Sequence, residues 1–349
     1  MKVYQIDPIA DPRWEKFIEG HPQASIFHTA GWLTALRQTY AYQPLAFTTS
    51  PPDTDLTCGF VVCGINSWLT GHRLVSLPFS DHCNPLFETP TQLNAVVDHL
   101  QHVLRTQSWK YLELRPTGNR FHGESDASAF VPIANYFLHT VDLQPETDEI
   151  LRGFHRNSVQ RRIRHAHRVN LRERHGNSLE LVESFYDLFV ITRKRQRLPP
   201  IPLTWFRSLI RYLGDALDIR VAYYDKQAVA AILTLRFRDV VYYKYGCSDA
   251  CFNHLGAMPW LLWNAMQHAK ANRASLFDMG RTEENNLGLL RFKDHFTDCR
   301  EKLIYWNCPG TRKSDLTRGW KLRAAKRIFT ILPNSILSLT GRILYRHIG

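Results

Sequence analysis

The 349-residue sequence contains no long apolar run. No window approaches the ~18 uncharged apolar residues that a membrane-spanning helix requires, and no basic N-terminal start precedes an apolar core. These absences argue against a spanning or a secreted protein, so we expect the chain to act in the cytoplasm. Its length is sufficient for two domains of ordinary size, each with its own core.

Cysteine is sparse and unpaired. The seven cysteines are an odd number without a paired C-x-x-C set, which favours a reducing compartment. Cys247, Cys251 and His254 lie close in sequence, but a fourth ligand at metal spacing is missing. We therefore predict core or loop cysteines, no metal and no bound cofactor.

Acidic residues are almost absent from two stretches of a chain whose formal net charge is +12. From residue 311 to 349, nine Lys or Arg side chains stand against Asp315 alone, a net charge of +8. Apolar residues interleave with these charges, so residues 315–332 and 336–345 are predicted to form two helical pieces. Such a basic tail suits either packing on the body or attachment to an anionic membrane.

The second stretch is an arginine run from residue 152 to 174 with a single acidic residue. Helices are predicted over 148–169, where Arg161, Arg164 and Arg168 recur at three- and four-residue spacing and share one face. A solvated face would usually alternate in sign. We therefore predict that this face binds phosphates, on a nucleotide-linked or lipid-linked acceptor or on a tRNA.

Hydrophobic periodicity predicts an α+β protein in which helices and strands interleave. Strands are expected at 47–49, 58–62, 74–77, 110–114, 219–224, 228–237 and 240–245, the last three as an antiparallel meander. Helices are expected at 91–107, 181–196 and 203–213. Turn and helix-start signals at 144–148 divide the chain into a first domain (1–145), a second (146–310) and the tail (311–349).

The most ordered segment runs from Tyr243 to Phe296. Its apolar spacing predicts a helix from about 257 to 272 and then a strand at 275–277. The strand is expected to run into a loop at residues 278–281, where Gly280 permits a positive φ and close approach of a ligand.

This segment resembles the FemAB-type branch of the GNAT N-acyltransferase superfamily, whose members share Y-x-Y-G, FDxGRT, N-x-GL and FK motifs. The matching stretches are Tyr243–Gly246, Phe277–Thr282, Asn286–Leu289 and Phe292–Lys293. The resemblance implies tandem GNAT-like domains with mixed, mostly antiparallel sheets flanked by helices, here followed by the basic helical tail.

The resemblance also implies roles. The FK lysine of the family lies near the transferred acyl group, so Lys293 is expected in an exposed cleft position, stabilising the oxyanion of the transition state. Asp278 and Arg281 either pair with each other or contact the substrate, Arg281 being the better ligand. Asn286 is expected to contact the substrate, and Arg193 belongs to a basic edge that borders the cleft in relatives.

Two further sets of residues are candidates. Tyr243 and Tyr245 alternate on one strand, so they are predicted to share a face, as aromatic core or as lining of an acyl channel. The polar loop at 76–85 is expected to contact the acceptor through Ser80 and Asp81. A Cys-His-Asp triad is not expected from this loop, since adjacent residues rarely face one another.

The donor is predicted from a missing motif. Acetyl-CoA enzymes of the superfamily carry a Q/R-x-x-G-x-G/A loop, but Asn253–Ala257 offers one glycine and no Arg or Gln in place. The resemblance therefore favours aminoacyl-tRNA as donor and an amine of a cell-envelope, peptidoglycan-type precursor as acceptor. Acyl-CoA or an acyl-carrier protein as donor, and a non-catalytic tRNA- or lipid-binding module, remain as alternatives.

Overall fold

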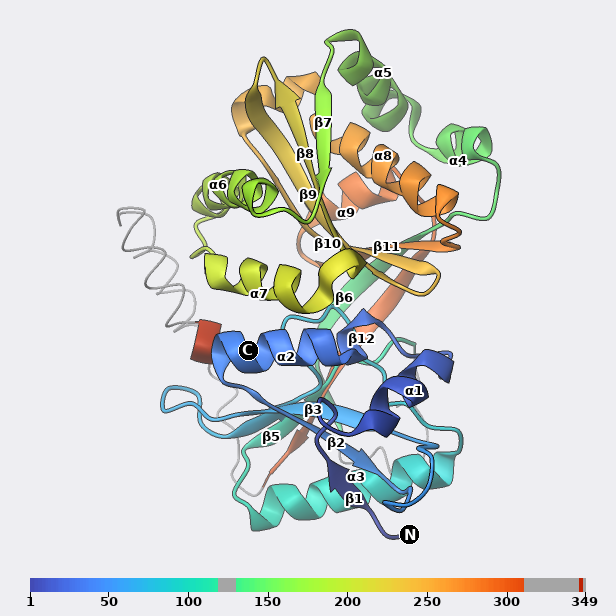
Figure 1. The fold of residues 1–349 in the computed structure, drawn as a ribbon, viewed down its shortest axis with the longest axis vertical. Coiled ribbons are helices and arrows are strands. Elements are labelled where there is room, and N and C mark those ends of the chain that lie inside the picture. The colour runs from blue at the N-terminus through green and yellow to red at the C-terminus, as the bar shows by residue number, and fades with distance from the viewer. Residues whose placement is uncertain (119–129, 311–344, 348–349) are drawn as a thin grey trace. The chain divides into compact units, whose positions relative to one another are not determined.

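The computed structural model describes residues 1–118, 130–310 and 345–347 (Figure 1). The described chain divides into two compact units. Unit 1 comprises Met1–Asn135 and takes up the chain again from Leu303, and unit 2 comprises Tyr136–Lys302. The division precedes the predicted boundary at 145 and falls within one continuous strand that runs from Val131 to Asp142. The predicted helical pieces of the tail fall almost wholly outside the described residues.

Unit 1 is a sheet in the order β1-β2-β3-β4-β5-β12. Its strands are β1 (Tyr4–Ile6), β2 (Gln43–Thr48), β3 (Phe60–Ile65), β4 (Arg73–Val75), β5 (Tyr111–Leu114) and β12 (Arg300–Pro309). Neighbours pair antiparallel except β4 with β5. The sheet packs with helices α1 (Pro12–Gly20), α2 (Ala30–Tyr40) and α3 (Pro90–Thr106) (Figure 1).

Helix α3 shows why the sequence folds as it does in unit 1. Pro90 occupies its first turn, and Thr89 and Gln92 form a capping box that satisfies the free amides at the start. The apolar stripe of Val96, Leu100 and Leu104 then packs into a core with strand residues of the sheet.

Unit 2 is a sheet in the order β6-β11-β10-β9-β8-β7. Its strands are β6 (Val131–Asp142), β7 (Arg172–Gly176), β8 (Leu217–Tyr224), β9 (Gln227–Phe237), β10 (Val240–Ser248) and β11 (Leu276–Glu283). Neighbours pair antiparallel except β10 with β11. The α+β class and the mostly antiparallel sheets are confirmed.

Helices cover both faces of this sheet (Figure 1). They are α4 (Thr147–Gly153), α5 (Arg161–Arg168), α6 (Leu179–Arg195), α7 (Leu203–Leu213), α8 (Ala257–Ala271) and α9 (Leu287–Asp294). Helices α5 and α8 share one apolar core with the sheet, whereas the aromatic residues of α6 and α7 pack together on the opposite side. The predicted meander is confirmed as β8–β10.

Candidate active site

A break in strand pairing sets the geometry of the predicted site. The parallel pairing of β10 and β11 covers Val240–Tyr242 and Leu276–Asp278, and both strands continue beyond it. On its other side β11 pairs with β6, with a register shift between Asp278 and Arg281. The predicted loop is therefore wrong: residues 278–281 form a β-bulge within a strand, and Gly280 takes the predicted positive φ, +71°.

Two charged side chains hold this bulge. Asp278 accepts a hydrogen bond at Oδ1 from the Gly280 amide over 2.6 Å. Lys293 donates from Nζ to the carbonyl oxygens of Gly280 (2.7 Å) and Arg281 (3.2 Å). The prediction of an exposed lysine is wrong, because Lys293 is 2% exposed. The bulge disrupts the ladder with β6, and the buried ammonium binds backbone oxygens at that point.

Arg281 and Asn286 border the bulge differently. The Arg281 guanidinium lies over the ring of Tyr136 at 4.4 Å from its centroid and remains partly exposed. Asn286 is the N-cap of α9, where its Oδ1 accepts a hydrogen bond from the Leu289 amide at 3.2 Å. Asn286 therefore caps the helix that carries Lys293.

A histidine that sequence reasoning missed lies opposite the bulge. His139 on β6 falls between the residues that pair with Asp278 and Arg281, and its side chain is fully buried. Its Nε2 lies 3.0 Å from Oδ1 of Asp294, the residue after Lys293. Burial lowers the pKa of His139, so the ring is neutral near neutral pH and donates from Nε2. His139 and Asp294 are 155 positions apart in the sequence, so no local pattern predicts their contact.

Tyr243 and Tyr245 lie on opposite faces of β10, so the prediction of a shared face is wrong. The register between β9 and β10 shifts between these two residues, and the extra residue, Lys244, reverses the alternation. Tyr243 packs in the core with α5 and α8. Tyr245 packs against Phe206 of α7 and accepts a hydrogen bond at Oη from Trp205 Nε1 at 3.0 Å.

Gly246 makes room for the Tyr243 phenol. A Cβ built on Gly246 would lie 1.9 Å from the Tyr243 hydroxyl. Burial raises the pKa of that hydroxyl well above its usual range. The Y-x-Y-G motif therefore encodes a tyrosine packed along its own strand.

The arginine face is present as predicted. Arg161, Arg164 and Arg168 are exposed on α5, and none of them has an acidic partner in the described part of the chain. Ile163 and Ala166 turn into the core. Arg193 lies elsewhere, on α6, with its guanidinium over the ring of its own neighbour on that helix, Phe189. The arginines predicted to bind substrate thus fall on separate helices, α5 and α6.

Ser80 and Asp81 belong to unit 1. Their loop is held by buried Arg115, which donates from Nη1 to the carbonyl oxygens of Leu77 (2.9 Å) and Ser80 (3.2 Å). The Asp81 carbonyl accepts a hydrogen bond from the Tyr305 hydroxyl at 2.6 Å. Ser80 is buried, so its side chain supports the loop in place of facing an acceptor.

Cys83 has a histidine neighbour, but the pair is not a nucleophile and base. Its Sγ lies 3.4 Å from Nε2 of His28. The amide of Ser25 donates to His28 Nδ1, so Nε2 carries the ring proton and donates it to the Asn84 carbonyl at 2.9 Å. Burial raises the thiol pKa to about 12 and lowers that of His28 to about 4. The thiol therefore stays protonated.

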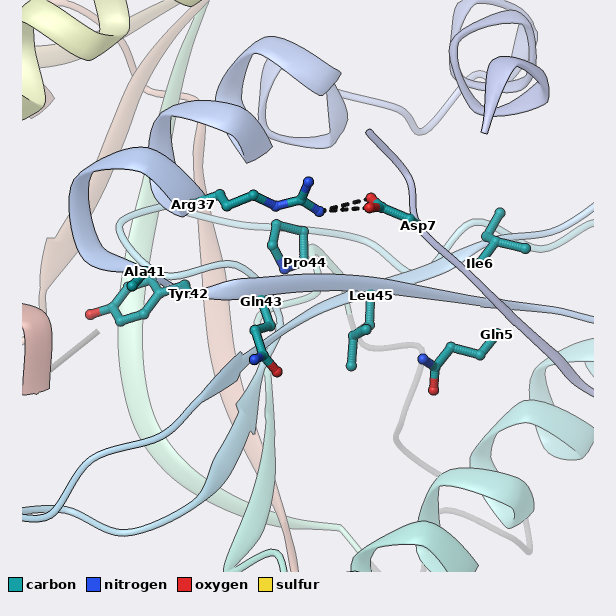
Figure 2. A pocket seen from close by; sticks show the side chains of 9 residues that line it. All are labelled: Gln5, Ile6, Asp7, Arg37, Ala41, Tyr42, Gln43, Pro44 and Leu45. Carbon is teal, nitrogen blue, oxygen red and sulfur yellow. Dashed lines mark hydrogen bonds and ion pairs between the residues drawn. The ribbon is translucent and has the colours of Figure 1, made fainter. Parts of the chain in front are cut away.

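Two hollows are lined by other residues. One, of about 500 Å³, lies beside the end of α2 and strands β1 and β2 (Figure 2). Its charged groups, Arg37 and Asp7, bind each other at 2.8 Å. The other, of about 220 Å³, lies beneath the C-terminal half of α8, where Arg220 pairs with Asp218. Their charges are largely satisfied within the protein.

In the described ranges, no helix combines the length and apolar character needed to traverse a bilayer. The same residues contain no group of three or more His, Cys, Asp or Glu side chains arranged to hold a metal ion. Cys251 is exposed and Cys247 is buried.

Comparison with known proteins assigns the fold. Residues 153–294 match the model of the acetyltransferase (GNAT) domain. The chain matches no curated protein sequence. Among solved structures it is similar to FemX, at a TM-score of 0.70 and 14% identity, covering 88% of this chain and 97% of that one.

Two more solved structures share this fold. The tandem GNAT protein from the clavulanic acid biosynthesis pathway is similar at a TM-score of 0.54 and 10% identity, covering 90% and 99% of the two chains. L-PGS from Bacillus licheniformis is similar at a TM-score of 0.53 and 13% identity, covering 90% of this chain and 96% of that one. The predicted tandem GNAT fold is thus confirmed, and the residues that match the acetyltransferase (GNAT) domain, 153–294, contain the β11 bulge and Lys293.

Proposed function

We propose that this chain is an N-acyltransferase that moves an aminoacyl group from aminoacyl-tRNA to an amine of a cell-envelope precursor. The observation that carries the proposal is the buried Lys293 ammonium at the β11 bulge. A charge fixed by two carbonyl oxygens needs little reorganisation when negative charge develops on an acyl oxygen. Pure binding does not require such a buried charge, which argues against a silent module.

The start of α8 supports a donor other than acyl-CoA. The third residue of the helix is Pro259, which lacks an amide hydrogen, and the Trp260 amide already donates to the Gly256 carbonyl. A Cβ on Gly256 would lie 2.6 Å from the carbonyl oxygen of Arg162 on α5. This oxygen occupies space beside the helix start and would repel a pyrophosphate.

The arginine face of α5 supports a phosphate-rich substrate. Helix α5 packs on this same start of α8, where Arg162 donates from Nη1 to the Asn253 carbonyl at 3.0 Å. Arg161, Arg164 and Arg168 point away from that contact into solvent. Three guanidinium groups without an acidic partner among the described residues suit the phosphates of a tRNA acceptor end or of a nucleotide-linked or lipid-linked precursor.

The membrane part of the proposal rests on the sequence of the tail. Residues 315–345 carry most of the net positive charge of the tail, which would attract an anionic leaflet at the cytoplasmic surface. A peripheral position there would bring the enzyme to a lipid-linked acceptor.

The donor is tested by offering each candidate donor to the protein separately. The full chain is incubated with labelled aminoacyl-tRNA or with acyl-CoAs, each with amine-bearing peptidoglycan precursors, and loss of donor is followed. Acceptor-dependent discharge of the tRNA supports the proposal, whereas acceptor-dependent turnover of acyl-CoA alone would replace it by the CoA alternative. Binding of both without turnover would leave a tRNA- or lipid-binding module. Lys293→Met separates enzymatic discharge from spontaneous hydrolysis.

A further inference from the structure

The loop between β3 and β4 presents two large apolar side chains to solvent. Trp68 is 83% exposed and Leu69 is 50% exposed. They are adjacent at the tip of a turn in unit 1. A lone exposed apolar residue is ordinary, but a tryptophan with an aliphatic neighbour at a protruding tip has the composition of an interfacial anchor.

The turn is ordered by its own hydrogen bonds. Ser67 accepts at Oγ from the Thr70 amide (2.9 Å) and at its carbonyl from the Gly71 amide (2.6 Å). Lys110 donates from Nζ to the Thr70 carbonyl at 3.1 Å. Gly71 has φ +83°, and a Cβ there would lie 2.3 Å from Lys110 Cε. The two apolar side chains are therefore displayed by a fixed backbone.

The surroundings of the turn are basic. The sequence from Phe60 to Ser80 contains no Asp or Glu. His72 and Arg346 are exposed nearby, and the Trp68 ring lies edge-on to the His347 ring at 5.4 Å. Lys110 adds a further charge at the base of the turn.

Described residues at both ends of the basic tail contact this turn or its base. Gly310, the residue before the tail, donates its amide to the Lys110 carbonyl at 2.9 Å. At the other end is His347, whose Nδ1 lies 3.0 Å from Ser67 Oγ and whose carbonyl accepts from Arg73 Nη2 at 2.9 Å. The sequence between these two points, residues 311–344, contains eight Lys or Arg residues against one Asp.

We infer that the Trp68–Leu69 turn is a membrane anchor that inserts into the headgroup region of an anionic bilayer. Tryptophan prefers that depth, the aliphatic neighbour adds apolar burial, and the surrounding cations match anionic headgroups. This inference deepens the membrane part of the proposed function but does not depend on the acyl donor. The apolar contact with the membrane is assigned to the turn of unit 1. The long-range attraction is assigned to the positive charges in the tail sequence.

The experiment uses the full chain with vesicles of phosphatidylcholine, with and without phosphatidylglycerol. Trp68→Ala combined with Leu69→Ser is expected to weaken partition onto anionic vesicles by at least about tenfold, and most at high salt, where attraction between charges is screened. Leu179→Ser removes a leucine of unit 2 that is at least as exposed as Leu69 and should change nothing. Equal partition of wild type and the double variant would overturn the anchor.

Depth is measured with lipids brominated in the upper acyl chain. Binding should quench part of the tryptophan fluorescence, and Trp68→Phe should remove that part while the protein stays bound. Quenching unchanged in Trp68→Phe would overturn the inference. So would self-association of the wild type that is lost in the double variant, since a second copy of the chain would then cover the turn.

Acyl transfer to a soluble acceptor without vesicles separates this inference from the proposed function. The double variant should match the wild type in that assay. If no donor is used but the vesicle results hold, the reaction is wrong and the anchor stands.

Discussion

The ammonium of Lys293 lies 2.7 Å from the carbonyl oxygen of Gly280, a residue whose own amide binds Asp278. The lysine satisfies backbone oxygens at the bulge, and in the proposed function the same buried positive charge stabilises an oxyanion. Both follow from the bulge in β11.

Lys293→Met should reduce both activity and stability. Loss of one oxyanion-stabilising group typically costs about 10²–10³ in rate. The Gly280 and Arg281 carbonyl oxygens, one buried and one partly buried, would also lose a donor, so the free energy of unfolding should fall by about 1–3 kcal/mol. Transfer kinetics at a temperature where the variant is folded, together with urea unfolding, check both effects. Turnover within a few-fold of wild type would contradict the role given to Lys293.

Replacing Arg161, Arg164 and Arg168 by Gln should raise KM more than it lowers kcat. These side chains are exposed, so the thermal midpoint should change little. The salt dependence of substrate binding should weaken, by a slope of about one for each lost phosphate contact.

A matched control tests position against net charge. Arg105 on α3, Arg207 on α7 and Arg273 in the turn after α8 are also exposed. Their replacement by Gln removes the same charge. If this control raises KM equally, the face on α5 has no special role.

Gly246→Ala should destabilise unit 2 by about 1–3 kcal/mol, because the new methyl group would collide with the Tyr243 hydroxyl. Tyr243→Phe removes the atom of closest contact and should recover part of the loss. A double-mutant cycle of unfolding free energies measures the coupling. Additive effects of the two substitutions would contradict the packing described for this motif.

Acid should destabilise unit 1 through His28. Burial lowers its pKa in the folded protein from 6.5 to about 4, so the unfolded chain binds the proton more tightly. Stability from this group is present above pH about 6.5 and is lost as pH falls toward about 4, by up to about 3 kcal/mol.

His28→Gln measures that contribution by comparison with exposed His254→Gln. Unfolding free energies are determined between pH 7 and pH 4, a range set by the linkage of His28. The His28 variant should lose less stability on acidification than the control variant does. Parallel pH profiles would show that His28 is not the group responsible.

Local sequence patterns were sufficient to predict many of the helices and strands of unit 2. Helix α8 was expected between 257 and 272 and is observed at Ala257–Ala271, and the β8–β9 turn at Asp225 and Lys226 has positive φ at both residues. The helical face of α5 followed from three- and four-residue spacing alone.

Features that depend on distant pairing were missed. Strand β6 and the return of β12 to β5 have no local signal, because their partners lie far away in sequence. Periodicity placed Tyr243 and Tyr245 on one face, since a period of two cannot reveal the inserted residue of a bulge. The prediction that Lys293 is exposed was wrong for the same reason. The partners of Lys293 are backbone oxygens that a second bulge, in β11, presents.

The return of the last strand to unit 1 has a consequence for synthesis. Strand β12 pairs with β5, so the sheet of unit 1 lacks a member until residues 303–309 have left the ribosome. The described part of unit 2, Tyr136–Lys302, is synthesised earlier. Pairings between distant segments form slowly. The edge of β5 therefore lacks its β12 partner until the C-terminal half has been synthesised. Nascent chains stalled before residue 300 should expose that edge to chaperones.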